Sequence, residues 1–287
     1  MIVFFAATRA LHFASLMMVF GASAFSTIAA KRVNLAPISN ALRKWLVIAA
    51  IIALVTSAIC LGFVTGQMAG DSAAAFDLRQ ISVVAGQTDY GHVFLTRAAL
   101  LAGLILLAIV NSAAWLRAVL SGAALALLGI VSHAAARGGD WRLALAANDG
   151  LHLLCAGFWI GALVVLAMLI RTRSADIVAA LRIFSGWAII AVALLVMAGS
   201  VNAAAILYQP GMTWSGVYLG WLAAKLVLAA LMIALALTNR FGILPAMVRG
   251  DKESAESLTM TVVMELSCAA LILLVVGILG ETAPMAM

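Results

Sequence analysis

The chain contains four histidines, each close to one end of an apolar segment: His12, His92, His133 and His152. Imidazole is a common protein ligand for copper, zinc and iron, and a neutral histidine is buried without the cost of burying a charge. These residues predict a metal or cofactor site if the fold brings them to one level. The elements that position them must therefore be identified first.

The composition is that of an integral membrane protein, because 66% of the 287 residues are hydrophobic and only 10% are charged. Apolar stretches long enough to cross about 30 Å of hydrocarbon predict an all-α, polytopic bundle of about eight membrane-spanning helices. The stretches cover roughly residues 10–30, 46–67, 91–110, 117–136, 149–170, 183–206, 216–238 and 256–280.

Basic residues predict the orientation of this bundle, because Lys and Arg collect in cytoplasmic loops. The first, third, fifth and seventh connections hold Lys31, Arg32, Arg43, Lys44, Arg117, Arg171, Arg173, Arg182, Arg240, Arg249 and Lys252. The other connections hold only Arg79, Arg137 and Arg142. Both termini are therefore expected on the outer, periplasmic side. The net charge of +6 follows from this asymmetry, so the expected partner is the lipid bilayer and no nucleic acid.

The connections are too short to hold a soluble domain, which predicts a single membrane domain over residues 1–287. An internal repeat suggests two four-helix halves, 1–140 and 141–287. Leu11-His12 precedes Gly21-Ala22 at the same spacing at which Leu151-His152 precedes Gly161-Ala162.

Helical rise places the four histidines within roughly 5 Å of one level near the outer ends of their helices. We therefore expect at least two of them to bind a metal. Cys155 follows His152 by one helical turn and shares its face, so it is either a further soft ligand or a packing residue.

Three charged residues fall inside the predicted spans: Lys225, Glu265 and Arg97. A lone ion in hydrocarbon costs several kcal/mol and needs a partner or a polar cavity. Lys225 and Glu265 are expected to pair across adjacent helices, either as a structural salt bridge or as part of an ion or proton path. Arg97 is expected to snorkel outward, bind an anion or keep the site electropositive.

Enzymatic motifs are missing from the sequence. It has no Ser-His-Asp order, no HExxH pair, no phosphate-binding glycine loop and no ATPase motif. Catalysis is therefore not expected, and a transported ion would be driven by its gradient, the membrane potential or a receiving chaperone.

Short motifs spread along nearly the whole chain resemble one family. They are Arg9-Ala10-Leu11-His12, Ser132-His133-Ala134, Asn148-Asp149-Gly150-Leu151-His152 with Trp159-Ile160-Gly161, Lys225-Leu226 and Asn239-Arg240. They are similar to motifs of the copper-resistance protein D (CopD) family of bacterial inner-membrane proteins. The resemblance implies an eight-helix, multi-pass inner-membrane protein that moves copper from periplasm to cytoplasm.

The same resemblance implies a copper role for His12, His133 and His152, and it does not cover His92. It also implies a periplasmic copper-binding partner of the CopC type. Some relatives carry such a domain fused to the chain, whereas this sequence does not, so the partner is expected to be a separate protein.

Two other functional classes stay open. Paired histidines such as His12 with His133, or His92 with His152, could hold a haem b between helices as in b-type cytochromes. A non-transporting assembly or scaffold protein would instead keep its cellular phenotype when all four histidines are replaced.

Overall fold

The computed structural model describes residues 2–132, 139–207, 214–251 and 253–282. Eight helical segments in this part of the chain are long and apolar enough to cross a membrane, as the sequence predicts. The long helices are α1 (Ile2–Ala29), α2 (Ala36–Ala69), α4 (Asp89–Ile109), α5 (Ala114–Ala126), α7 (Arg142–Arg171), α8 (Ile177–Leu207), α9 (Gly216–Thr238) and α11 (Ser254–Leu279). The short ones are η1 (Ser72–Phe76), α3 (Leu78–Gln87), η2 (Leu127–Val131), η3 (Gly139–Trp141), the π-helical turn η4 (Asn239–Ile243) and α10 (Leu244–Val248).

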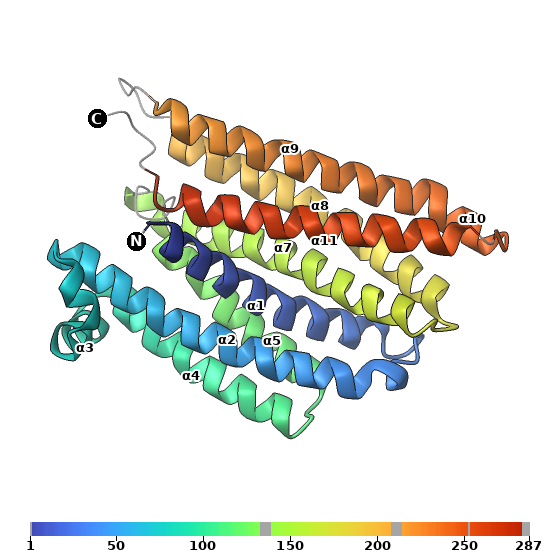
Figure 1. The fold of residues 1–287 in the computed structure, drawn as a ribbon, viewed down its shortest axis with the longest axis horizontal. Coiled ribbons are helices and arrows are strands. Elements are labelled where there is room, and N and C mark those ends of the chain that lie inside the picture. The colour runs from blue at the N-terminus through green and yellow to red at the C-terminus, as the bar shows by residue number, and fades with distance from the viewer. Residues whose placement is uncertain (1, 133–138, 208–213, 252, 283–287) are drawn as a thin grey trace.

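Successive long helices run in opposite directions through one bundle (Figure 1). The start of α1 and the end of α11 therefore lie at the same end, which we call the terminal end. The opposite end, where α1 connects to α2, is called the far end. The distribution of basic residues predicts that the terminal end faces the periplasm.

The centre of the bundle is formed by α1 and α7, which pack closely against each other. They cross at Gly21 and Gly161. A Cβ atom on Gly21 would lie 2.0 Å from the carbonyl oxygen of Gly157, and one on Gly161 would lie 2.4 Å from the backbone nitrogen of Ala22. Only glycine permits this approach of two backbones, a device that membrane bundles use widely.

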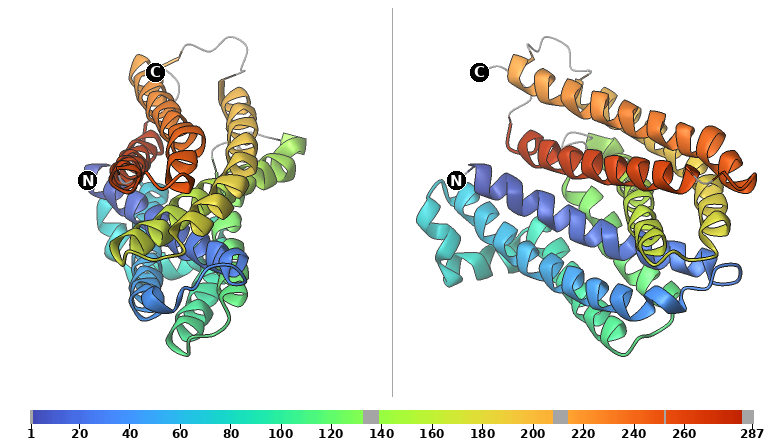
Figure 2. Two further views of the ribbon diagram at one scale, coloured as in Figure 1. Left: turned by 90° about the vertical axis from the view of Figure 1, so that its right-hand side faces the viewer. Right: turned by 45° about the vertical axis from the view of Figure 1, so that its right-hand side comes forward.

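The other long helices form two groups on either side of the central pair. One group is α2, α4 and α5, and the other is α8, α9 and α11 (Figures 1 and 2). In the first group α4 packs along α2, whereas in the described part of the second group α9 packs on α11 and hardly touches α8. A cavity of about 230 Å³ separates α8 from α9 and η4 in the far-end half, and its polar lining includes Ser185, Asn239 and Arg240.

Several helices begin earlier than the sequence predicts, among them α1, α2 and α8, and two differences in boundary affect the candidate site. Helix α7 begins at Arg142, well before the predicted start at residue 149, so His152 lies deeper than expected. The fourth span leaves the α-helical conformation at Ala126 and continues as η2. At this point a Cβ on Gly129 would come within 2.1 Å of the Ala146 carbonyl oxygen, so the backbone of η2 packs directly on α7.

The connection between the second and third spans folds into η1 and α3 at the terminal end. Asp77 caps the start of α3, since its carboxylate accepts hydrogen bonds from the backbone N–H groups of Arg79 and Gln80. The side-chain amide of Gln80 donates to the same carboxylate at 3.1 Å. This side-chain bond, followed by the bond from the Arg79 N–H, lowers the pKa of Asp77.

Candidate metal centre

His12 lies on α1, about 15 Å along the helix from Ile2, and only 4% of its surface is exposed. Its Nδ1 is 3.0 Å from both the Ala53 carbonyl oxygen and Thr56 Oγ1 on α2. A carbonyl oxygen only accepts, so Nδ1 carries the proton and Nε2 holds the lone pair. Helix α2 therefore fixes both the tautomer and the orientation of the ring.

The lone pair of His12 is taken by Arg97. The Arg97 guanidinium of α4 donates through Nη2 to His12 Nε2 and through Nε to the Ala124 carbonyl oxygen at 2.8 Å. Arg97 is 5% exposed, so it neither snorkels outward nor is left free for an anion. In this structure a guanidinium occupies the position where a metal would meet His12.

His152 lies on α7, about 15 Å along the helix from Arg142, and is half-buried. Its Nδ1 is 3.1 Å from the Leu195 carbonyl oxygen of α8, so this nitrogen also carries the proton. Gly199 flanks the ring, since a Cβ there would be 3.1 Å from His152 Cε1. In the described residues no hydrogen bond is made to Nε2, which leaves its lone pair available for a ligand.

Polar groups surround His152 on three helices. Asn202 of α8 donates to Asp149 Oδ1 at 2.7 Å and accepts a bond of the same length from Asn148. Lys225 of α9 interacts electrostatically with both Asp149 and His152. Because Asp149 precedes His152 by one helical turn, a carboxylate and an imidazole lie on one face of α7.

Glu265 is fully buried in α11 and forms a separate network nearer the far end. Trp159 Nε1 of α7 donates to Glu265 Oε2 at 3.0 Å, and Asn239 Nδ2 donates to Oε1 at 2.6 Å. Thr261 Oγ1 in turn donates to Asn239 Oδ1 at 2.5 Å. Asn239 begins the π-helical turn η4, a local departure from α-helix that is frequent at functional sites.

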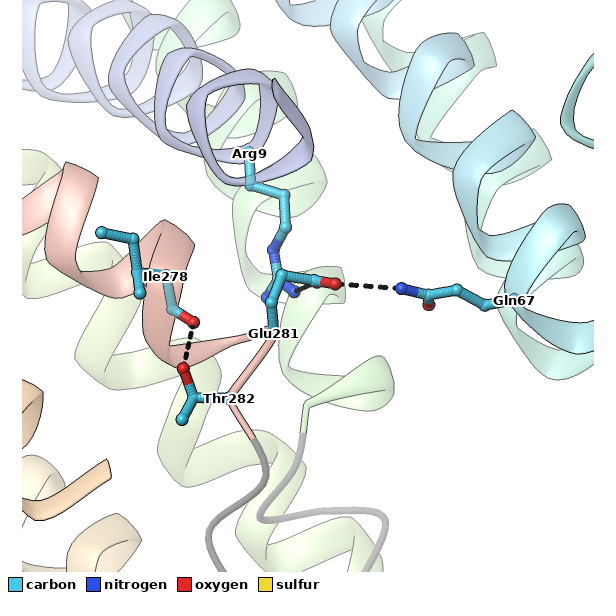
Figure 3. A network of polar contacts seen from close by, with 5 residues as sticks. All are labelled: Arg9, Gln67, Ile278, Glu281 and Thr282. Atoms are coloured by element: carbon cyan, nitrogen blue, oxygen red, sulfur yellow. Dashed lines mark hydrogen bonds and ion pairs between the residues drawn. The ribbon is translucent and has the colours of Figure 1, made fainter. Parts of the chain in front are cut away.

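A third polar network lies at the terminal end, beside α1. Glu281 accepts from Arg9 Nη1 at 3.0 Å and from Gln67 Nε2 at 2.9 Å, which ties the end of α11 to α1 and α2 (Figure 3). Arg9 also lies over the ring of Phe5 at 5.7 Å from its centroid. The charge of Arg9 is therefore partly neutralised, although it still interacts with His12.

The expected ion pair between Lys225 and Glu265 is not formed. The only ion pairs within the described residues join Arg9 to Glu281 and Arg142 to Asp89. Lys225 instead interacts electrostatically with Asp149. The Glu265 carboxylate accepts hydrogen bonds from two uncharged side chains, those of Trp159 and Asn239. The prediction of pairing was wrong because the sequence does not show towards which neighbour each helix face is turned.

The described histidines also do not converge on one point, as the single-cluster expectation required. His92 is exposed at the start of α4, where its Nε2 is 3.0 Å from the Gly86 carbonyl oxygen, and His133 lies outside the described residues. Among the described residues no three His, Cys, Asp or Glu side chains group together as a metal site. Cys155 is buried in the apolar core. The ligand roles expected for these residues therefore stay predictions.

Comparison with known proteins identifies the family. The N-terminal domain of copper resistance protein D-like proteins matches residues 1–143, and the copper resistance protein D domain matches residues 178–279. Copper resistance protein D of Pseudomonas syringae pv. tomato is 30% identical over 97% of this chain and 96% of its own length. The chain belongs to the copper resistance protein D family.

A second relative of this family member is the inner membrane protein YebZ of Escherichia coli (strain K12). It is 26% identical over 97% of both chains. No solved structure matches the chain significantly. With eight apolar helical segments in its described residues, this copper resistance protein D homologue is a multi-pass inner-membrane protein.

The sequence analysis did not identify the residues that interact with Lys225 and Glu265. Asp149, Trp159 and Asn239 lie within the family motifs but carried no predicted role. One signal could have identified Asp149: the repeat that relates His12 to His152 also relates Arg9 to Asp149. A carboxylate at that position is what distinguishes the second motif from the first.

Proposed function

We propose that this protein binds copper near the terminal end at His152 and Asp149 and carries it across the inner membrane towards the cytoplasm. The observation that supports the proposal best is the tautomer of His152. A metal-binding histidine commonly donates its other N–H to a carbonyl or carboxylate, and His152 does so to Leu195. Its Nε2 is thereby oriented as a ligand before any metal arrives.

Electrostatics favour a cation at this position over the equivalent one at His12. Asp149 supplies a negative charge one turn before His152, and it offsets the nearby ammonium of Lys225. His12 is instead next to two cations, Arg97 and Arg9. Of these two histidines, only His152 therefore has a carboxylate within one helical turn that attracts a copper ion.

The groups deeper in the bundle offer an onward route. The buried carboxyl of Glu265 and the amide of Asn239 are oxygen donors nearer the far end. Asn239 also borders the cavity between α8 and α9. We propose that copper leaving His152 passes along this side of α7, and that a separate periplasmic copper-binding protein of the CopC type supplies it.

The binding step is tested by elemental analysis of detergent-purified protein loaded with copper in the presence of ascorbate and then washed. We expect copper bound in about equal amount to the protein, and at least a tenfold loss in His152→Ala. His92→Ala is the matched control, because His92 is exposed and its ring contacts the carbonyl oxygen of Gly86 in α3. Full copper retention in a folded His152→Ala protein would refute the site, and iron in place of copper would support a haem protein.

The transport step needs an assay in cells. Cells producing the wild type should accumulate more copper than cells producing an equal amount of His152→Ala. Equal accumulation at matched membrane levels, with copper still bound by the purified wild type, would favour a binding or scaffold role without transport.

A further inference from the structure

The two halves of the bundle repeat the same histidine arrangement in space. His12 of α1 donates through Nδ1 to a carbonyl of α2, and His152 of α7 donates through Nδ1 to a carbonyl of α8. The accepting residues, Ala53 and Leu195, have nearly the same offset in sequence as the two histidines. Each half therefore uses its second long helix to orient the histidine of its first.

The third long helix of each half adds a cation. Arg97 of α4 bonds to His12, and Lys225 of α9 interacts electrostatically with His152. Both cations lie about 12 to 14 Å along their helices from the terminal end, at nearly the depth of the histidines. Two halves thus share a unit of histidine, carbonyl and cation, contributed in the same helix order.

The crossing of α1 and α7 indicates how the halves are related. A Cβ on Gly21 would touch Gly161, and a Cβ on Gly161 would touch Gly21. Residues at equivalent positions meet each other only at a two-fold axis. Because α1 and α7 both start at the terminal end, this axis runs along the bundle, as in membrane proteins built from parallel repeats.

The two histidine units differ in how closely their cation and helices pack around the histidine. In the first, Arg97 bridges His12 and the Ala124 carbonyl, and α4 packs along α2. In the second, Lys225 is half-buried and makes no hydrogen bond within the described residues, and α9 diverges from α8. A guanidinium presents a rigid fork of donors that can hold two acceptors at once, whereas a lysine ammonium is a flexible point charge.

We infer that the chain is a tandem duplication with one histidine pocket for a cation in each half, and that Arg97 permanently fills the first pocket while the second is open to copper. The inference rests on the proposed function for the ligand of the second pocket. The inference also predicts that the first pocket can bind copper once Arg97 is removed. Without Arg97, the lone pair of His12 Nε2 would be left without its donor, and an imidazole nitrogen is a suitable ligand for copper.

The second pocket is tested by exchanging its cation. Lys225→Arg should introduce the filling group and reduce bound copper at least tenfold. Lys44→Arg makes the same exchange at an exposed lysine near the start of α2, so this control should keep about one copper per chain. Both are measured by elemental analysis after loading with copper and ascorbate, on protein with wild-type helix content and elution volume. Copper retained in full by Lys225→Arg would overturn the inference.

The first pocket is tested by Arg97→Met. Bound copper should rise from about one to about two ions per chain, and the added ion should disappear in Arg97→Met, His12→Ala. An unchanged copper content in a folded Arg97→Met protein would overturn the inference and leave the site at His152 intact. If the wild type bound no copper and Arg97→Met bound one, the assignment of a first pocket filled by Arg97 would stand. Copper binding in the second pocket, and with it the proposed function, would fail.

Discussion

Glu265 offers a sharp test of the buried polar network, because its two carboxyl oxygens accept from two different helices. Removing the side chain with Glu265→Ala leaves the Trp159 and Asn239 donors unpaired in the protein interior. Each unpaired donor costs about 1–3 kcal/mol. Interactions inside membranes fall at the lower end of such ranges, so we expect a total loss of about 2–4 kcal/mol in the free energy of unfolding.

Glu265→Gln should be milder. Its carbonyl oxygen can still accept from Asn239, but its amide then faces the indole N–H of Trp159, donor against donor. The expected loss is therefore about 1–2 kcal/mol, roughly half that of alanine. Trp159→Phe removes the conflicting indole N–H, so the double variant with Glu265→Gln should lose less stability than the sum of the two single variants.

Unfolding by sodium dodecyl sulfate in mixed micelles, followed by circular dichroism, measures these free energies. Glu256→Ala on the exposed face of the same helix is the matched control and should change stability by less than about 0.5 kcal/mol. Equal losses for Glu265→Ala and Glu256→Ala would refute the argument. Strict additivity of Glu265→Gln and Trp159→Phe would show that the two side chains do not interact.

Three further predictions concern packing, ligand orientation and capping. Gly161→Ala should lower the free energy of unfolding by about 1–3 kcal/mol, because its Cβ would meet backbone atoms of α1, whereas Gly186→Ala, with open space around it, should not. Gly199→Ala should weaken copper binding about tenfold, because its Cβ would press on the ring of His152, whereas the free energy of unfolding should change little. Titration against a copper chelator measures the affinity. Asp77→Ala should speed hydrogen exchange in α3. In the wild type, the pKa of Asp77 is lowered, so its capping contribution is present above the ordinary carboxyl pKa of about 4. The contribution is lost as the pH falls further, through the pKa of the folded state. The protection of α3 should therefore be constant from pH 8 to 5.

The spans and their alternation could be predicted from the sequence because both depend on local properties. Hydrocarbon thickness sets the length of an apolar run, and the eight predicted stretches match the eight apolar helical segments described. Boundaries were less predictable where backbone packing decides them. The close contact at Gly129, which accompanies the end of the fourth α-helix, depends on a neighbour that is distant in sequence.

The contacts of the candidate site could not be predicted in the same way. His12 and Arg97 lie 85 residues apart, and their contact requires two helices to be neighbours with the correct faces turned together. Hydropathy contains no information about rotation around a helix axis. Lys225 was assigned to Glu265 for this reason, although the carboxylate with which it interacts electrostatically is Asp149. The internal repeat was the one sequence feature that carried long-range information.

That repeat allows the effect of a single sequence difference to be estimated. Arg9 and Asp149 are equivalent positions one turn before the two histidines, where side chains lie about 6–8 Å from a ligand on the ring. At an effective dielectric constant of about 20, a unit charge at that distance changes the energy of a monovalent cation by about 2 kcal/mol. Reversal of the sign therefore separates the two pockets by up to about 4 kcal/mol, and by about half of that if Glu281 neutralises Arg9. Since 1.4 kcal/mol is a factor of ten, copper would prefer the second pocket by roughly thirty-fold to a thousand-fold even before Arg97 fills the first. Both halves thus orient their histidine through a bond from Nδ1 to a carbonyl oxygen, and yet only one half needs to bind copper. The charge next to each histidine and the cation opposite it decide which pocket a copper ion can enter.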